Sequence, residues 1–509
     1  MRSAEVRLLL IFAIGAATSF LPDAMAKPRA RFRRSCAALA LHVLAFAFVA
    51  SLMLLVTRRP SFSAFVTVAL VCLVVVVSNA KYKALREPFV FSDLSLFSQL
   101  FSHPRLYLPF LSPAAVAGAL AAVVALSAGY CSETSPYPDT RVGAALTALV
   151  CLFAGRLVAA RLPLTLDANN DQRRHGFFAV FVALLLNGLR PTTFETLLRT
   201  LETSPFAGSV PRVRPDVIVI QSESYFDARD HIPAIEPAVY AQFDRACRES
   251  VMHGRLAVPA WGANTMRTEF SVLTGVASER LGYARFYPYA FLRRRCASLA
   301  GWFRRAGHRT TAIHPYYADF FGRDRAYPLL QFERFLDIRH FADVERTGAY
   351  VGDVAVADAV IAELDASADS PVFVFAMTME NHGPLHLEFV SPGESLPLHR
   401  LGEDADWRDL TAYLRHVANA DAMIGRLLGY LRERRRDTVV CFYGDHVPAL
   451  GHVFDKLGAS PEKSNYFIWR NFDVLSGERQ DLRAEELGSA LLRATSVDQA
   501  NAQLECSPE

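Results

Sequence analysis

A strong net charge and a cysteine framework are the two features most plainly missing from this sequence. Its 54 lysine and arginine residues nearly balance its 51 aspartate and glutamate residues, which leaves a formal net charge of +3. No basic patch of the kind that binds nucleic acid stands out, so that class of partner has no support. The eight cysteines form no obvious disulfide framework, and four of them fall within or next to the apolar first third: Cys36, Cys72, Cys131 and Cys151.

Charged residues are also scarce within five long runs of the first third. These runs lie near 6–21, 37–56, 62–78, 111–128 and 142–160. Each could cross about 30 Å of hydrocarbon with a modest shortfall at most. A cleaved signal peptide is the alternative for the first run, because "AMA" precedes Lys27, but the weakly basic start and the further runs favour an uncleaved helix. We therefore expect a membrane domain of about five helices over 1–165, and a chain of two or more domains.

Three segments leave the membrane topology open. The link at 27–35 is strongly basic, whereas five spans with a cytoplasmic N-terminus would place this link outside, against the positive-inside tendency. The apolar run at 176–189, within a juxtamembrane linker over 166–214, predicts either a sixth crossing or an interfacial helix. The segment at 79–107 predicts an amphipathic loop helix or a site for anionic lipid headgroups, since aromatic residues alternate with Lys81, Lys83, Arg86 and Arg105.

From about Pro215 the pattern changes to that of an α/β domain. Four short runs are almost continuously apolar, as strands buried on both faces are: 216–222, 310–315, 372–379 and 438–444. Helical patterns lie between them, the clearest at 407–436, where apolar residues recur at intervals of three and four. This alternation predicts a mostly parallel central sheet with helices on both faces.

Acidic or imidazole side chains follow each of these four runs. They are Glu223, His314, the Glu-Asn-His of 380–382, and Asp445 with His446. Ligands of such sheets gather at the carboxyl ends of the strands, so we expect these side chains to meet there. Polar turns would explain any one of them, but less readily all four. Two carboxylates and an imidazole suit one divalent ion, with Mn²⁺ or Mg²⁺ favoured and Zn²⁺ an alternative.

A hydroxyl nucleophile is suggested by the segment "PAWGANTMRTEFSVLTG" at 259–275. Its glycine and asparagine predict a turn that ends at Thr265, where a helix begins. The alternative is that Thr265 only caps this helix, with Thr268 or Glu269 completing the cap. Coordination to a divalent cation would lower the pKa of the hydroxyl enough for attack on phosphorus.

Five motifs in this order resemble those of a known family: "IQSESYFD", "GANTMRTEFSVLTG", "HPYYADFFGRDRAYPLLQFERF", "MENHGP" and "YGDHVP". Together with the multi-span N-terminus, they resemble the lipoteichoic acid synthase-like phosphoglycerol transferases of the alkaline phosphatase and sulfatase superfamily. The resemblance covers roughly 60–475, and its specificity comes from the number and order of the motifs. It implies a sulfatase-like catalytic domain, which we place at 215–480, followed by a polar tail at 481–509.

The resemblance also implies roles for individual residues. One divalent ion would be bound by Glu223, Thr265, Asp445 and His446, with Thr265 as the nucleophile. The headgroup would be bound, or proton transfer assisted, by His314, Phe321, Arg323 and His382. Phe321 stands where lipoteichoic acid synthases carry tryptophan, and Asn264 stands where they carry lysine, so the acceptor stays open.

The implied reaction moves phosphoglycerol from a phosphatidylglycerol-type lipid to a glycan acceptor through a phospho-threonine intermediate. The protein would be a multi-pass protein of the inner, cytoplasmic membrane, with its catalytic domain facing the periplasm or the cell exterior. A phosphoethanolamine transferase, which usually uses zinc and several disulfides, is one alternative; a sulfatase-like phosphodiester hydrolase is another, although the C/S-x-P-x-R segment of true sulfatases is absent. An inactive envelope scaffold is the non-enzymatic alternative.

Overall fold

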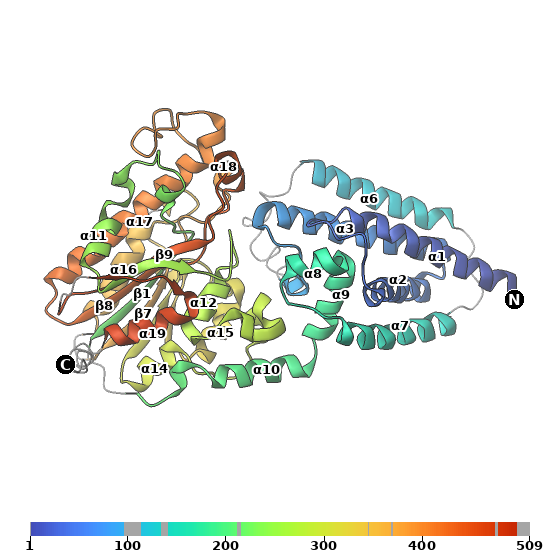
Figure 1. Cartoon of the computed structure of the whole chain (residues 1–509), viewed down its shortest axis with the longest axis horizontal. Helices are drawn as coiled ribbons and strands as arrows, with labels where there is room; N and C mark the ends of the chain where they lie inside the picture. Colours follow the sequence, from blue (N-terminus) through green and yellow to red (C-terminus); the bar gives the residue numbers. More distant parts are fainter. Residues whose placement is uncertain are drawn as a thin grey trace, which may run out of the picture. The chain divides into compact units, whose positions relative to one another are not determined.

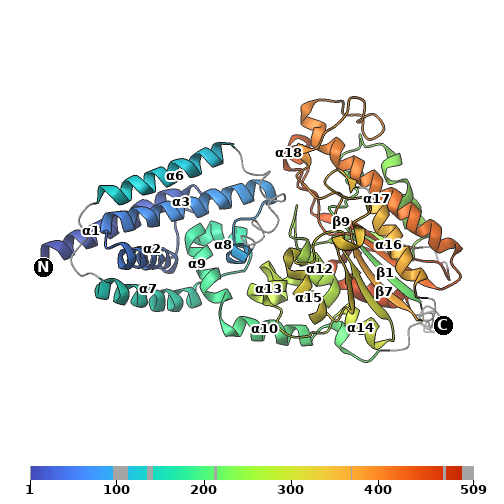
Figure 2. The ribbon, with the colours of Figure 1, turned by 180° about the vertical axis from the view of Figure 1, so that it is seen from behind.

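The chain forms two compact units, Met1–Thr193 and Phe194–Glu509 (Figures 1 and 2). The computed structural model describes residues 2–95, 113–133, 141–210, 215–344, 346–367, 370–473 and 477–495. The first unit is helical throughout its described part, whereas the second is built on a sheet. We describe each unit by itself.

The first unit consists of helices, all but the polar α8 with largely apolar sequences. They are α1 (Arg2–Ala24), α2 (Cys36–Thr57), α3 (Pro60–Leu85), α6 (Pro113–Ser132), α7 (Arg141–Arg161), α8 (Ala168–His175) and α9 (Phe177–Gly188). Four helices of the described chain are long and apolar enough to cross a membrane, at Glu5–Ala24, Cys36–Thr57, Pro60–Leu85 and Arg141–Arg161. These helices confirm the predicted multi-span membrane domain. The expected span at 111–128 falls in α6, although its first two residues lie outside the described chain.

The packing of these helices is that of segments surrounded by lipid. Small residues occupy the helix contacts, among them Ala38, Ala159 and Ala183, which are almost fully buried. Many large apolar side chains point outward, among them Leu9 and Phe153, which are 71% and 67% exposed, although others such as Leu41 and Phe46 are fully buried. Small residues let the backbones approach each other, while lipid tails can solvate the outer face.

The polar links of this unit are partly neutralised. Arg34, from the basic link at 27–35, pairs with the buried Asp23, which also accepts a 2.7 Å hydrogen bond from the backbone N–H of Phe178. Lys81, one of the cations considered for a lipid headgroup, pairs with Asp93 at 2.6 Å and with Glu87 at 3.2 Å. The rest of that segment from 96 onward, Arg105 included, lies outside the described residues.

The apolar run at 176–189 forms α9, which packs against α2 and α7. A break of a few residues joins it to α10 (Pro191–Glu202), and the two helices are bent by 71°. Pro191 favours this break because its ring cannot continue a helix from the preceding turn. The pair is therefore a broken span or a re-entrant loop, and counting it as one span raises the number of spans to five.

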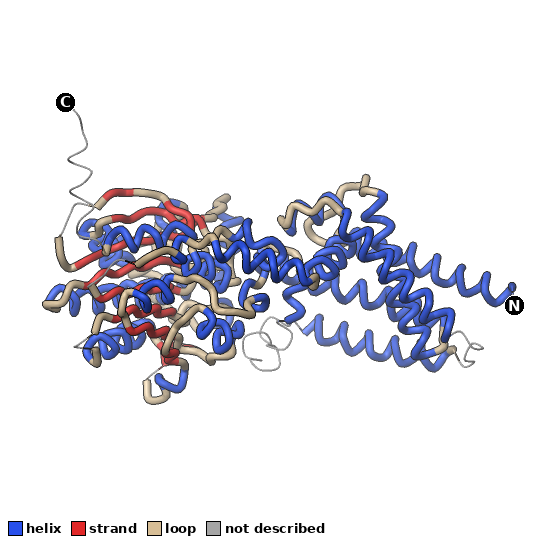
Figure 3. The backbone as a smooth tube through the Cα atoms, turned by 90° about the horizontal axis from the view of Figure 1, so that it is seen from below, coloured by secondary structure: helices blue, strands red, loops and turns tan. Residues whose placement is uncertain are grey.

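The second unit contains a nine-stranded sheet, whose strands lie side by side in Figure 3. Along the sheet the order is β10-β2-β9-β8-β1-β7-β3-β4, with β11 also paired to β2. Only β9 runs antiparallel to its neighbours, which confirms the predicted mostly parallel sheet. The strands are β1 (Asp216–Ser222), β2 (Met252–Ala257), β3 (Arg309–Ile313), β4 (Arg334–Leu336), β7 (Val372–Met377), β8 (Thr438–Gly444), β9 (Lys463–Arg470), β10 (Glu478–Arg479) and β11 (Leu482–Arg483). A separate ribbon pairs β5 (Arg346–Thr347) with β6 (Tyr350–Val351).

Helices cover both faces of this sheet (Figure 1). On one face, α11 (Ala241–Glu249), α16 (Asp353–Asp365) and α17 (Arg408–Glu433) enclose a large apolar core with side chains such as Ile218, Val374 and Val440. The intervening strand residues point to the other face, where Phe373 stacks on Phe303 of α14 (Leu299–Arg305) at 4.7 Å. The remaining helices are α12 (Thr265–Thr274), α13 (Pro288–Phe291), α15 (Arg323–Leu329), α18 (Gly451–Leu457) and α19 (Ala484–Ala494).

The segment expected to be a polar tail contributes to the fold. Leu482–Arg483 forms β11, and Ala484–Ala494 forms α19, which packs on α12. Leu487 and Leu491 stand four residues apart on one buried face of this helix, which agrees with the weak helical periodicity of this segment's sequence. The tail beyond 495 lies outside the described residues.

Candidate active site

The ends of β1 and β8 place three ligand-type side chains together. The two strands are parallel neighbours, and their last aligned pair is Ser222 with Gly444, so Glu223 and Asp445 leave the sheet side by side. His446 follows directly. One ligand atom from each of the three lies within 4.8 Å of the others, and His446 Nε2 is 3.5 Å from Glu223 Oε1 and 3.4 Å from Asp445 Oδ2.

The hydrogen bonds around this cluster leave two of its ligand atoms, Asp445 Oδ2 and His446 Nε2, without a partner among the described residues. Asp445 Oδ1 accepts hydrogen bonds from the backbone N–H groups of Ser224 (2.8 Å) and His446 (2.9 Å). His446 Nδ1 lies 3.1 Å from the carbonyl oxygen of Val447, which orients the ring. Asp445 Oδ2 and His446 Nε2 are buried and have no hydrogen-bond partner within the described chain. Unpartnered buried polar atoms are costly, so these two atoms fit the ligands of a cation.

The charge of the cluster also suits a divalent ion. Burial, and then the neighbouring Asp445 carboxylate, raise the pKa of Glu223 to about 7. Two buried carboxylates therefore repel each other unless a proton or a cation lies between them. Two oxygen donors and one nitrogen donor fit Mg²⁺, Mn²⁺ or Zn²⁺.

The loop that carries these ligands also holds the start of α12. The backbone N–H of Gly262 donates to the carbonyl oxygen of Val447 (3.0 Å), and Thr268 Oγ1 donates to that of Asp445 (2.7 Å). Asn264 is the N-cap, in a left-handed conformation with φ 65°, and the buried Thr265 is the first helical residue. Thr265 is therefore not the cap of this helix, as the alternative proposed. Thr265 as a ligand and nucleophile stays a prediction.

Arg323, the first residue of α15, is held by a buried carboxylate of α12, that of Glu269. Its Nη2 lies 2.7 Å from Glu269 Oε2, and Glu269 also accepts hydrogen bonds from the hydroxyls of Tyr289 (2.5 Å) and Tyr327 (2.6 Å). Burial opposes the charge of Glu269, but Arg323 and the two phenols hold its pKa below the usual value. Arg323 Nη1 is buried without a hydrogen-bond partner among the residues described, so one N–H group remains available to an anion.

The two predicted histidines border the same region. Burial, followed by the positive charge of Arg323, lowers the pKa of His314 well below its usual value. Burial also lowers the pKa of His382, whose Nδ1 is 2.8 Å from the carbonyl oxygen of Gly383. The ring of Phe320 is 6.5 Å from both imidazoles, and the guanidinium of Arg323 is 5.3 Å from the ring of Phe321. The two imidazoles and these aromatic rings therefore lie in the neighbourhood of the Arg323 guanidinium.

Comparison with known proteins identifies the family. A sulfatase family model matches residues 215–497. The capsular polysaccharide biosynthesis protein RkpI of Rhizobium meliloti (strain 1021) is 31% identical over 439 residues, which cover 81% of this chain and 78% of RkpI. The chain belongs to the sulfatase family. This membership confirms the superfamily predicted from the five motifs.

One solved structure, that of EptA, shows the same fold for this sulfatase-family protein, and a second is similar to it in part. The integral membrane lipooligosaccharide phosphoethanolamine transferase EptA of Neisseria meningitidis matches with a TM-score of 0.52 and 14% identity, over 90% of this chain and 95% of EptA. The phosphoglycerol transferase GacH of Streptococcus pyogenes, solved with sn-glycerol-1-phosphate, matches with a TM-score of 0.46 and 20% identity, over 59% of this chain and 79% of GacH. At these identities the matches concern the fold and not the substrate.

One acid that was expected at this sulfatase-family site lies elsewhere. Glu380 accepts hydrogen bonds from His416 Nδ1 (2.9 Å), from the side chain of Asn419 and from the backbone N–H of Asp353 (2.8 Å). It therefore fixes the start of α16 against α17 instead of facing the metal-ligand cluster. Its position after β7 was visible in the sequence, but the direction of its side chain was not.

Sequence reasoning also overlooked residues that support the site. Glu269 was considered only as part of a helix cap, although it is the partner of Arg323, and two residues 54 positions apart form no local pattern. Ser224 follows Glu223 directly, and its Oγ donates to Glu223 Oε1 at 3.0 Å. A hydroxyl next to a ligand is a common supporting contact, so this signal could have been used.

Proposed function

We propose that this protein is a membrane-bound, metal-dependent phosphotransferase that moves phosphoglycerol from a phosphatidylglycerol-type lipid to a glycan through a phosphorylated Thr265. The observation that supports it most is the buried cluster of Glu223, Asp445 and His446, with its unpartnered inner atoms. The loop of this cluster is bonded to the start of α12, whose first residue is Thr265.

A divalent ion held by Glu223, Asp445 and His446, with Thr265 as a fourth ligand, would polarise the phosphate and lower the pKa of the hydroxyl; Mg²⁺ and Mn²⁺ are favoured. Thr265 Oγ attacks the phosphorus, its bond to phosphorus forms, and the bond from phosphorus to the diacylglycerol oxygen breaks. The proton lost by Thr265 passes to that leaving oxygen. Arg323 Nη1 stabilises the nonbridging oxygens, because it is charged and has no other partner in the described structure.

The second step regenerates the enzyme. His382 Nδ1 faces a carbonyl oxygen, which only accepts hydrogen bonds, so this nitrogen carries the proton and Nε2 is the free base. The base takes the proton of the acceptor hydroxyl as its oxygen attacks phosphorus. The bond from phosphorus to Thr265 Oγ then breaks, and Thr265 takes back a proton from the protonated His382, which returns both groups to their starting state. His314, which is also neutral, borders the headgroup together with Phe321.

The membrane helices and the relatives support the two substrates. Four long apolar helices keep the protein in the membrane, where a lipid donor is concentrated. RkpI, named for capsular polysaccharide biosynthesis, supports a glycan acceptor. We place the protein in the inner membrane with its catalytic domain facing the periplasm or the cell exterior. Phosphoethanolamine transfer is the competing activity, because EptA shares the fold across most of both chains.

The test uses membranes that contain the full-length protein, with headgroup-labelled phosphatidylglycerol or phosphatidylethanolamine, with and without Mn²⁺. We expect metal-dependent release of diacylglycerol from phosphatidylglycerol, label retained on the protein, and loss of both in Thr265→Ala. Thr265→Ser is the matched control, because it keeps a hydroxyl at the same place. Release that survives Thr265→Ala would assign the chemistry to another group. Release only from phosphatidylethanolamine would change the donor, and no release from either lipid would favour an inactive scaffold.

A further inference from the structure

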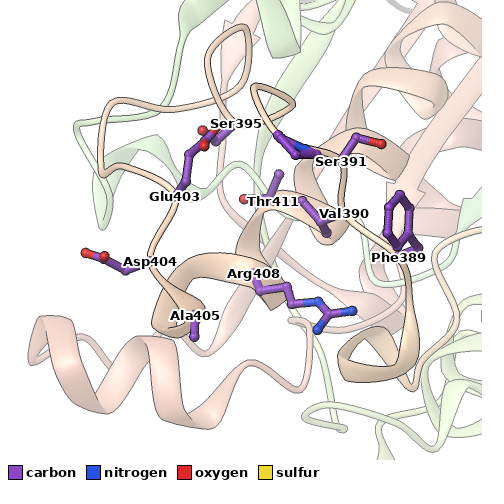
Figure 4. Close-up of a pocket in the computed structure, with 10 residues that line it drawn as sticks. Phe389, Val390, Ser391, Ser395, Glu403, Asp404, Ala405, Arg408 and Thr411 are labelled. Carbon is purple, nitrogen blue, oxygen red and sulfur yellow. The ribbon is translucent and has the colours of Figure 1, made fainter.

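A pocket of about 310 Å³ lies beside the start of α17, and none of the predicted site residues lines it. Its walls come from the loop at 389–395, the segment at 403–405 and the first turn of α17 (Figure 4). In this view Phe389 stands on one side, and Glu403 and Ser395 stand on the other. The loop continues from Gly383 and Pro384, which directly follow His382.

The side chains in this pocket combine an exposed ring with a buried, free hydroxyl. Phe389 is 75% exposed, which is unusual for a large aromatic side chain. Ser395 is 3% exposed, yet its Oγ has no hydrogen-bond partner within the described chain. Glu403, Asp404 and Arg408 are exposed at the rim. The pocket therefore offers an apolar face, a hydroxyl that lacks a partner, and groups that both donate and accept hydrogen bonds.

The loop is fixed to α17 before any ligand arrives. Arg408 Nη2 donates to the carbonyl oxygen of Glu388 (2.8 Å). Arg415 Nη1 donates to the carbonyl oxygen of Phe389 (3.1 Å) and to Glu394 Oε1 (2.6 Å). Because these bonds already order the loop, a ligand would bind with a small entropic cost.

This chemistry fits a neutral carbohydrate better than an anion. Two carboxylates against one guanidinium would repel a phosphate, whereas sugar hydroxyls can donate to Glu403 and accept from Arg408. The apolar C–H face of a sugar ring can pack on Phe389. We propose that this pocket binds a neutral segment of the acceptor glycan. That this carbohydrate is the acceptor rests on the proposed function, whereas the binding of a carbohydrate in this pocket does not.

The location of the pocket is compatible with this role. Phe389 is seven positions after His382 in the sequence. The two residues therefore lie within about 25 Å of each other even if the chain between them is fully extended. His416 holds this segment in place, because its Nδ1 lies 2.9 Å from Glu380 and its Nε2 lies 2.8 Å from Glu388. A bound oligosaccharide could thus place a terminal hydroxyl near His382.

The test measures binding without any phospholipid, so that a failure of phosphotransfer cannot affect it. Full-length protein in detergent micelles is titrated with neutral α- and β-linked glucose oligosaccharides and with sn-glycerol-1-phosphate, and binding is followed by saturation-transfer NMR and calorimetry. We expect binding of an oligosaccharide, a dissociation constant about tenfold higher in Phe389→Ala, and a smaller increase in Ser395→Ala. Leu396→Ala is the matched control, since Leu396 lies on the same loop, is 72% exposed and does not line the pocket.

Four results would overturn the proposal. Three of them are no binding of any oligosaccharide in the set, equal binding by Phe389→Ala and wild type, and loss of binding in Leu396→Ala as large as that in Phe389→Ala. Displacement of a bound oligosaccharide by glycerol phosphate would also overturn it, because the occupant would then be anionic. Binding as expected in a protein that shows no phosphotransfer would keep the carbohydrate site and remove only its role as acceptor site.

Discussion

Individual residues at the site keep polar atoms unpaired although their side chains are buried. Asp445 Oδ2, His446 Nε2, His314 Nδ1 and Arg323 Nη1 all lack hydrogen-bond partners within the described chain. Other atoms of Asp445, His446 and Arg323 are bonded, so these three groups are fixed in direction. Buried unsatisfied groups lower stability, and their concentration in one place indicates selection for binding rather than for folding.

The buried ion pair of Glu269 and Arg323 can be tested by substitution of Glu269. Glu269→Gln removes the charge that balances the fully buried Arg323, and breaking such a pair costs about 3–5 kcal/mol of unfolding free energy. We expect a thermal midpoint lower by several degrees. All four tryptophans lie in the second unit, so tryptophan fluorescence of the full-length protein in micelles reports on that unit. Glu249→Gln is the control, because Glu249 forms partly exposed pairs and should cost under about 1 kcal/mol. Equal decreases of the thermal midpoint in Glu269→Gln and Glu249→Gln would contradict this explanation.

At the scale of elements, the sequence predicted best where one local pattern decides the structure. β1 and β8 were predicted to the residue, since their near-continuous apolar runs require burial on both faces. β2 was missed because its residues are alternately half-buried and include His253 and Arg255. The position of Glu223 and Asp445 followed from the strand ends, whereas the pairing of Glu269 with Arg323 depends on tertiary packing that no local pattern reveals.

The junction of β1 and β8 leaves no room for a side chain at Gly444. A Cβ there would lie 1.9 Å from the carbonyl oxygen of Tyr225, and this backbone atom cannot move without shifting Glu223. We expect Gly444→Ala to abolish phosphotransfer and to reduce the amount of folded protein. Gly451→Ala is the matched control, since a Cβ at Gly451 meets nothing within 4 Å. Activity, Mn²⁺ binding and the thermal midpoint should all remain close to wild type in that variant, and full activity of Gly444→Ala would refute the close approach.

His416 joins α17 to the segment that follows β7, and its charge makes this contact dependent on pH. Burial alone would lower the pKa of His416, but hydrogen bonds to Glu380 and Glu388 raise it to about 9. A histidine whose pKa is raised by folding stabilises the protein fully below about 6.5, and this contribution is lost as the pH rises through about 9. We expect the thermal midpoint of the wild type to decrease as the pH rises from about 6.5 to about 9, and to decrease less in His416→Gln. Parallel pH profiles of the two proteins would contradict this assignment.

The whole molecule combines two units that differ in packing. The second unit buries large apolar side chains beneath both faces of a sheet, whereas the first leaves many of them exposed on its outer surface and places small residues at several of its helix contacts. Hydropathy was sufficient to predict both classes of unit. It could not predict the bend of 71° between α9 and α10, which depends on neighbouring elements, and the weak helical periodicity of the expected tail was not enough to predict the helix α19.

The number of membrane crossings decides on which sides the two termini lie. The 20 residues of α6 span about 30 Å at 1.5 Å per residue, which is enough to cross the hydrocarbon. If α6 crosses and the bent pair of α9 and α10 is re-entrant, the four spans become five, and an odd number of crossings puts the N-terminus and the second unit on opposite sides of the membrane. With the second unit outside, as we propose, the N-terminus would be cytoplasmic. We therefore expect fluorescence from green fluorescent protein fused to the N-terminus and activity from alkaline phosphatase fused to the C-terminus. The basic link at 27–35 would then lie outside, although Asp23 pairs with one of its arginines. Reporters that place both termini outside would show that α6 does not cross and that the positive charges set the orientation.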